Sequence, residues 1–243
     1  MNPLRFFCRP INERTAVLTG REAHHLSAVL RLGVGQTVEL FDGAGAWAEA
    51  AVTAVEKDRV VLAVQKLQTV PPAFRERIVL AVSLAKADRF EWVISKCTEL
   101  GVDRICPVRC ERTVKQARGE RALKRYQHLA VVAAKQCRRL FLPQIDPPAS
   151  LTDSLEMMRK DYPQGRILLG SLSPQAEPLI KVKWTASDVL AFIGPEGGLT
   201  AKEIDLLRQH QAHPVRLTDT TLRIETAALA CAAILSAQRT AAS

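Results

Sequence analysis

The sequence is poor in aromatic residues and lacks the cysteine pairs of a zinc site. Phe, Trp and Tyr make up only 5% of it, so stacking on nucleic-acid bases cannot extend along a long groove. The six cysteines contain no CxxC pair, and structural zinc requires four ligands in recognisable pairs. We therefore expect no metal site, and thiols that stay reduced and mostly buried in a cytoplasmic protein.

Long hydrophobic runs are also missing. No segment reaches the roughly eighteen apolar residues that indicate a transmembrane helix. The N-terminal sequence Met-Asn-Pro-Leu-Arg-Phe-Phe has no long apolar core after its charge, which a secretory signal requires. The sequence therefore argues against a membrane span and against secretion.

What is present is a basic chain with enough apolar residues, 47%, to form a core. Lys and Arg total 34 against 25 Asp and Glu, a net charge of +9, which favours a polyanionic partner. Between Arg112 and Arg139 there are nine basic residues and one Glu, and helical periodicity places many of the basic ones on one side. The basic stripe comprises Arg118, Arg121, Arg125, His128, Lys135 and Arg139. It predicts phosphate binding, with simple solubility as the alternative.

Residues 1–70 have the pattern of a small β-barrel. Several short segments of strand composition are joined by tight turns. The predicted strands are 38–41, 46–52 and 60–64. Thr19 to Leu32 carries apolar residues at helical spacing, which predicts one helix among them. Two prolines within 68–73 end the last strand, so we expect a first domain at 1–70 and a second at 74–243.

Residues 74–243 alternate between strand and helix patterns. Apolar runs of strand length are followed by amphipathic stretches, often with capping signals. The predicted strands are 78–84, 104–108, 167–169, 189–193 and 215–217, and the predicted helices are 89–100, 119–137, 151–160 and 222–238. This alternation predicts an α/β domain in which helices cover both faces of a mostly parallel sheet.

Glycines occur late in this domain. The turn after its first strand, Ser83 to Arg89, contains none, although a dinucleotide-type site would need them there. Three of the twelve glycines fall instead in Gly194-Pro-Glu-Gly-Gly198, after the apolar run 188–193. Thr200-Ala-Lys-Glu203 then has capping-box spacing and opens a further helix. A strand, a glycine loop and a helix are predicted, with the ligand site in the C-terminal half.

Several motifs, in order, resemble the RsmE-type branch of the SPOUT methyltransferases, from the first residues to about Gln238. They are Lys86-x-Asp88-Arg89-x-Glu91-Trp92, Lys96-x-x-Glu99-Leu100-Gly101-Val102, Gln136-Cys137-x-Arg139-x-x-x-Pro143, Gly194-Pro-Glu-Gly-Gly198 and Leu222-Arg223-x-Glu225-Thr226-Ala227. The resemblance implies S-adenosylmethionine as cofactor and N3 of a uridine in 16S rRNA as acceptor, in free rRNA or in the small ribosomal subunit. It also implies a deep trefoil knot in the C-terminal domain, a homodimer and a PUA-like barrel that contacts RNA.

Site residues follow from the resemblance and from the charge pattern. The expected cofactor-binding residues are Leu169, Gly170, Ser171, Gly194, Pro195, Glu196, Gly197, Gly198, Leu217, Leu222 and Arg223. The expected RNA-binding residues are Arg5, Arg9, Arg31, Lys96, Arg112, Lys135, Arg138 and Arg139. The last helix is apolar nearly all round, which a two-fold interface would explain better than burial in its own domain.

Arg223 and Glu225 are the expected catalytic residues. Uridine N3 carries a proton and is a poor nucleophile until it loses that proton. Arg223 would stabilise the charge developing on the uracil oxygens. Glu225 or Glu196 would accept the proton or hold Arg223, and the sequence leaves the base open. An ion pair of Arg223 with Glu225 that only supports the fold is the alternative.

Three positions depart from the pattern of the family. Thr218 follows Leu217 where glycine is usual, Ile224 stands where threonine is usual, and Lys135 replaces a glutamate. Since Thr does not readily adopt positive φ, the cofactor loop is in question at Thr218. Two other functions stay open: another SPOUT RNA methyltransferase, such as a ribose 2′-O enzyme, or a non-catalytic RNA-binding factor in ribosome assembly.

Overall fold

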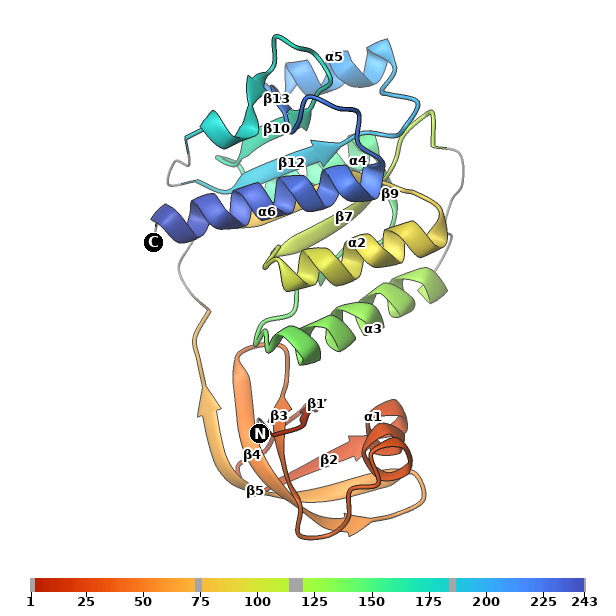
Figure 1. The fold of residues 1–243 in the computed structure, drawn as a ribbon, viewed down its shortest axis with the longest axis vertical. Helices are drawn as coiled ribbons and strands as arrows, with labels where there is room; N and C mark the ends of the chain where they lie inside the picture. The colour runs from red at the N-terminus through yellow and green to blue at the C-terminus, as the bar shows by residue number, and fades with distance from the viewer. Residues whose placement is uncertain (1–2, 73–75, 114–119, 184–186, 243) are drawn as a thin grey trace. The chain divides into compact units, whose positions relative to one another are not determined.

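The computed structural model describes residues 3–72, 76–113, 120–183 and 187–242. The chain divides into two compact units (Figure 1). One comprises Met1–Phe74 and Val131–Leu142, and the other comprises Arg75–Ala130 and Pro143–Ser243. The short second segment of the first unit was not indicated by the sequence. The domain limits 1–70 and 74–243 stay a prediction.

The first unit is built on a five-stranded sheet. Its order is β1 (Arg5–Phe7), β3 (Thr37–Phe41), β4 (Ala46–Val55), β5 (Arg59–Thr69), β2 (Thr15–Thr19). The β1–β3 pair is parallel and the other pairs are antiparallel. Alternate residues such as Leu40, Ala48 and Leu62 form its core, as a sheet with one buried face requires. The three predicted strands are found in β3, β4 and β5, whereas β1 and β2 were missed.

The predicted helix among these strands is shorter than expected, and its second half is wound more widely than an α-helix. α1 (Gly20–His24) continues into a π-helical turn, η1 (His25–Val29). The ring of His25 lies 5.7 Å from that of Phe6, whereas His24 is exposed. One histidine therefore packs and the other faces solvent.

The second unit contains an eight-stranded sheet in which every described pair is parallel. Its order is β11 (Glu177–Pro178), β13 (His213–Arg216), β10 (Arg166–Gly170), β12 (Val189–Ile193), β6 (Ile78–Ser83), β7 (Arg104–Arg109), β8 (Gln144–Ile145), with β9 (Ala149–Ser150) beside β7. All residues of β6 and β12 are buried, which explains their continuous apolar sequences.

Helices cover both faces of this sheet (Figure 1). They are α2 (Ala87–Glu99), α4 (Leu151–Asp161), α5 (Ala201–Gln209) and α6 (Ile224–Ala242), with a 3-10 turn η2 (Leu179–Lys181). A further helix, α3 (Glu120–Cys137), contacts α2 through the rings of Tyr126 and Phe90, and its last turns belong to the first unit. α2 and α6 lie side by side on one face. Leu155 of α4 and Leu207 of α5 share a core with Val79 and Phe192 of the strands, on the other face. The predicted α/β class with a parallel sheet is confirmed.

Each helix in the described ranges falls short of the combined length and hydrophobicity needed to cross a bilayer. The longest, α3 and α6, differ in character. α3 carries exposed basic residues such as Arg121, and Arg118 of the predicted stripe lies outside the described residues. α6 is dominated by alanine and leucine.

Candidate active site

Three loops that the sequence singled out lie at one edge of the parallel sheet. β13, β10 and β12 are neighbours with the same direction, so their carboxyl ends meet at the same edge. The segments 169–171, 194–198 and 217–222 follow or close these three ends. The structure therefore brings together the segments predicted to bind the cofactor.

The glycine loop 194–198 has a defined conformation. The N–H of Gly198 donates to the carbonyl of Pro195 at 2.8 Å, and Gly198 has φ +71°, which favours glycine. At Gly197, by contrast, an added Cβ would meet only Arg112, at 3.6 Å. The loop is a tight turn with an open outer side, where a ligand can approach the backbone.

The helix after the loop begins with the predicted capping box. The side chain of Thr200 accepts from the backbone N–H of Glu203, and Glu203 accepts the N–H of Thr200 at 2.8 Å. The other carboxylate oxygen of Glu203 accepts the N–H of Glu111 at 2.9 Å. One buried carboxylate thus starts α5 and holds the segment after β7 against it.

Arg112 binds the glycine loop itself. Its Nη1 donates to the carbonyl of Gly197 at 2.8 Å. The sequence assigned Arg112 to RNA, and that role stays a prediction. Its position shows that a residue of the expected RNA surface also touches the expected cofactor loop.

Arg89 is a residue that the sequence reasoning did not assign to the site. It lies in the first turn of α2, and its Nη1 donates to Glu196 Oε1 at 2.7 Å. Its Nε lies 3.7 Å from Glu225 Oε1. The only signal was its place in the motif Lys86 to Trp92. That motif contributed to the family resemblance, but no function was predicted for Arg89 within it.

Glu225 is buried in the first turn of α6, and its Oε2 has no hydrogen-bond partner within the described ranges. The amino end of a helix stabilises a negative charge, so the carboxylate suits this place. A buried oxygen without a donor is unusual in a folded protein. It points to a group that joins the site from outside the chain.

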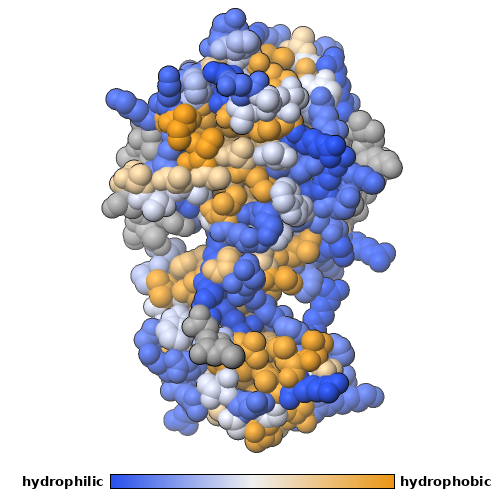
Figure 2. Space-filling view, viewed as in Figure 1, coloured by the Kyte–Doolittle hydropathy of each residue, from blue (hydrophilic) through white to orange (hydrophobic). Residues whose placement is uncertain are grey.

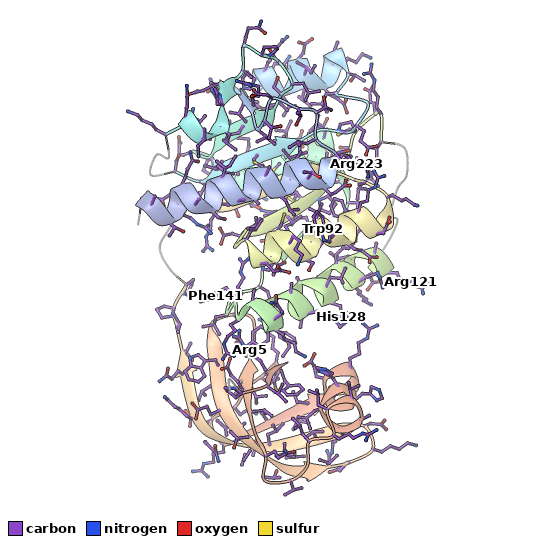
Figure 3. The ribbon with its side chains drawn as sticks, in the orientation of Figure 1. Arg5, Trp92, Arg121, His128, Phe141 and Arg223 are labelled. Atoms are coloured by element: carbon purple, nitrogen blue, oxygen red, sulfur yellow. The ribbon has the colours of Figure 1, made fainter. Side chains whose placement is uncertain are left out.

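Arg223 lies just before α6 and is exposed (Figure 3). In the parts of the chain that the structure describes, its guanidinium makes no hydrogen bond or ion pair. The alternative pair with Glu225 is not formed there, because Glu225 faces Arg89 instead. A cation held at the site edge without a partner can act on an incoming ligand.

The remaining cofactor-binding candidates line the same edge. The N–H of Ser171 donates to the carbonyl of Val215 at 2.8 Å, which fixes the loop after β10 to β13. Leu169, Leu217 and Leu222 are half-buried, so part of each apolar side chain stays accessible. Thr218 donates to the carbonyl of Thr220 at 2.8 Å. Positive φ outside glycine occurs in the described residues at Arg31, Arg138 and Gln211, so Thr218 fits its loop without strain.

A buried thiol near the glycine loop is a poor nucleophile at neutral pH. Cys110 lies near the glycine loop, and burial raises its pKa to about 12, with the nearby Glu203 carboxylate adding to the effect. The reactive form of cysteine is the thiolate, which is therefore scarce here at neutral pH.

A separate hollow of about 470 Å³ lies at the opposite end of β10, beside Arg159, Arg166 and His210. Both Nη atoms of Arg159 donate to backbone carbonyls, those of Gly165 and His210. Its charge is thus used within the protein, and parallel sheets bind ligands at the other edge. We do not assign the active site there.

Two of the expected RNA-binding cations of the first unit are ion-paired and largely buried. Arg5 Nε lies 2.8 Å from Glu39 Oε1, and its side chain is 6% exposed; burial lowers its pKa, which Glu39 partly offsets. Lys135 Nζ lies 2.8 Å from Glu22 Oε2, and its side chain is 14% exposed. Phosphate binding by these two residues stays a prediction, but they have a structural role in this unit.

The other RNA-binding candidates are more accessible. Arg9 and Arg31 are exposed on the first unit. Arg138 pairs with Glu39 while 40% of its side chain stays exposed, and Lys96 pairs with Glu99 on α2 at 2.8 Å. Arg139 is half-buried at the end of the α3 region. Their contact with RNA likewise stays a prediction.

The fold and this site define an RNA methyltransferase. A family profile described as an RNA methyltransferase domain matches residues 72–236, and one described as an RNA methyltransferase PUA domain matches residues 18–65. The ribosomal RNA small subunit methyltransferase E of Synechocystis is 31% identical over 220 residues, 89% of this chain and 71% of that protein. The enzyme of the same name from Bacillus subtilis is 29% identical, over 92% of this chain and 90% of that protein.

Solved structures agree. A ribosomal RNA small subunit methyltransferase E from Neisseria gonorrhoeae, bound to S-adenosyl methionine, is 28% identical with a TM-score of 0.85, over 98% of both chains. A methyltransferase from Legionella pneumophila in complex with the same cofactor is 26% identical with a TM-score of 0.87, also over 98% of both. The chain belongs to the ribosomal RNA small subunit methyltransferase E family. The resemblance drawn from its motifs is confirmed.

Proposed function

We propose that this enzyme transfers a methyl group from S-adenosylmethionine to N3 of a uridine in 16S small-subunit rRNA. Family membership supports an rRNA methyltransferase over a ribose 2′-O enzyme or a non-catalytic assembly factor. One observation carries the chemistry. Buried Glu225 has an Oε2 without a hydrogen-bond partner in the described residues, and its Oε1 lies 3.7 Å from Arg89, which also binds Glu196 of the glycine loop.

The residues at this edge fit the cofactor. Exposed Gly197 and Gly198 leave the loop backbone open to a ligand, as polar atoms of an adenosine would require. Leu217 and Leu222 offer apolar surface for the adenine ring of the cofactor. Segment 169–171 is the third loop of the proposed cofactor site. When bound, S-adenosylmethionine supplies a methyl group whose carbon–sulfur bond breaks as the bond to nitrogen forms, leaving a neutral thioether.

The protein must make N3 of uridine nucleophilic. Arg223 is exposed and unpaired in the described residues, so it is available to donate to a uracil oxygen as negative charge develops there. The N3 proton needs an acceptor of its own. Arg223 lies just before α6, and Glu225, a candidate for that acceptor, lies in its first turn.

Glu225 is the better base of the two carboxylates. Glu196 is half-exposed and its Oε1 already accepts from Arg89 at 2.7 Å. Glu225 is buried, and its Oε2 accepts no hydrogen bond from the described residues. An oxygen that accepts no hydrogen bond has a free lone pair for an incoming proton. We assign proton removal to Glu225 and the loop contact to Glu196.

Further properties implied by the family belong to this proposal. They are the trefoil knot, a homodimer, a cytoplasmic location and the small ribosomal subunit as a possible context. The dimer has support from α6, whose buried side includes Ala228 and Cys231 while Leu229 and Ile234 on other sides stay half-buried. Apolar side chains gather along and beside α6 on the face in view (Figure 2). A second copy would cover them.

Mass spectrometry of rRNA tests the reaction. Small-subunit rRNA from cells without the protein should lack one methyl group on a uridine base, and the purified enzyme with S-adenosylmethionine should restore it. Fragmentation distinguishes the base from the ribose. A methyl group restored on a ribose, or none restored, would overturn the proposal.

A further inference from the structure

Arg89 connects two parts of the site that are far apart in sequence. From α2 it reaches Glu196 on the glycine loop, 107 residues away, at 2.7 Å. It also lies 3.7 Å from Glu225 at the start of α6. We propose that Arg89 is a positioning residue that links cofactor binding to the base: one guanidinium holds both the glycine loop and the carboxylate of Glu225. This inference rests on the proposed function.

Both carboxylates have the same cationic partner. Arg89 is the charged residue that the structure records beside Glu196 and beside Glu225. Its guanidinium lies at Oε1 of Glu225, whereas Oε2 has no hydrogen-bond partner in the described residues. One oxygen of the carboxylate is therefore held by Arg89, and the other is available to a ligand.

Stability alone does not explain this arrangement. The Arg89 side chain is 34% exposed and that of Glu196 is 51% exposed, and ion pairs of such exposure contribute little to folding. The loop also has other anchors, the contact of Arg112 with the Gly197 carbonyl and the capping box of Glu203. The loop should therefore keep its fold without Arg89 and lose the alignment of Glu196.

The linkage predicts a specific pattern of cofactor binding. Arg89→Ala and Glu196→Gln each break the same contact, so each should weaken S-adenosylmethionine binding by a similar factor, about 5- to 20-fold. The double variant Arg89→Ala/Glu196→Gln should bind no more weakly than the weaker single variant, because the contact can be lost only once. Calorimetry with S-adenosylmethionine measures this cycle without any RNA.

The rate of methylation tests the second proposed role of Arg89, which is to position the carboxylate of Glu225. At saturating cofactor and RNA, Arg89→Ala should lower kcat about 10²-fold, because the carboxylate of Glu225 loses the residue that holds its Oε1. Glu196→Gln leaves the guanidinium beside Glu225, so it should keep the wild-type kcat while its KM for cofactor rises.

Two control variants distinguish the loss of the Arg89 contacts from the loss of any arginine and from the loss of charge alone. Arg208→Ala removes an exposed arginine that pairs with Asp205 in the same unit, and should change neither binding nor rate. Arg89→Lys keeps the charge but cannot hold two carboxylates with a planar fork, so it should recover kcat more than the cofactor affinity. It also serves if Arg89→Ala fails to fold.

The inference is overturned if the Arg89→Ala and Glu196→Gln effects on cofactor binding add, or if the folded Arg89→Ala variant keeps the wild-type kcat at saturating cofactor and RNA. Failure of the proposed function looks different. In that case the wild-type protein itself would place no methyl group on uridine N3, whatever the variants do.

Discussion

Replacing Glu225 by glutamine keeps the shape of the side chain and removes its capacity to accept a proton. Glu225 is buried and its Oε2 has no hydrogen-bond partner in the described residues, whereas Oε1 of Glu196 already accepts from Arg89. General bases contribute about 10²- to 10⁴-fold. For a base this shielded we expect a loss of about 10³-fold in the chemical step, or about 4 kcal/mol in activation free energy.

Single-turnover methylation as a function of pH is the decisive assay. The uridine N3 proton can also be lost to solvent, and that route grows with pH. The Glu225→Gln rate should therefore rise about tenfold per pH unit over a range in which the wild-type rate is flat. Binding of S-adenosylmethionine should change little, because the loop contact runs through Glu196. The difference between variant and wild type should narrow steadily toward alkaline pH.

A matched control is Glu156→Gln, which changes an exposed glutamate on α4 and should have no effect. Two results would refute the reasoning. A Glu225→Gln enzyme with a near-normal rate at neutral pH would show that the proton leaves by another path. A slow enzyme whose rate does not recover at alkaline pH would assign Glu225 a role other than proton removal.

Three further predictions follow from the same geometry. Arg223→Ala should lower kcat about 10²- to 10³-fold with little change in cofactor affinity; near-normal turnover with saturating substrates would contradict its role. Arg138→Ala with Arg139→Ala should flatten the salt dependence of RNA affinity by less than about two in log–log slope, because Arg138 is already paired with Glu39, and a salt-independent affinity would exclude phosphate binding. Lys135→Met leaves Glu22 without its cation and should cost about 2 kcal/mol in urea unfolding, partly recovered by Glu22→Gln.

The sequence predicted the scaffold of the site well because its signals are local. The apolar run before Gly194 and the capping box at Thr200 are set by neighbours within a few residues, and β12 and α5 begin and end close to where these signals place them. Parallel pairing then follows from strand and helix alternation. β1 and β2, at three and five residues, are too short for periodicity to detect.

Such local signals could not predict side-chain contacts between segments that are far apart in the sequence. Nothing in the pattern around Arg89 indicates a partner 107 residues away, and the spacing of Arg223 and Glu225 suggested a pair with each other. The local rule failed because a residue at the start of a helix can turn toward a neighbouring helix as easily as toward its own first turn. α2 packs beside α6, and this packing places Arg89 of α2 next to Glu225 of α6.

The same limit applies to the basic stripe, with a consequence for RNA binding. Counting charge along α3 treats each cation as unpaired, yet Arg125 pairs with Glu91 and Lys135 pairs with Glu22. A cation already neutralised by a carboxylate releases few counterions when a phosphate approaches. The salt slope of RNA affinity should therefore be smaller than the nine basic residues between Arg112 and Arg139 would give. Glu91→Gln should steepen that slope by about one by freeing Arg125, and an unchanged slope would show that Arg125 does not face the RNA.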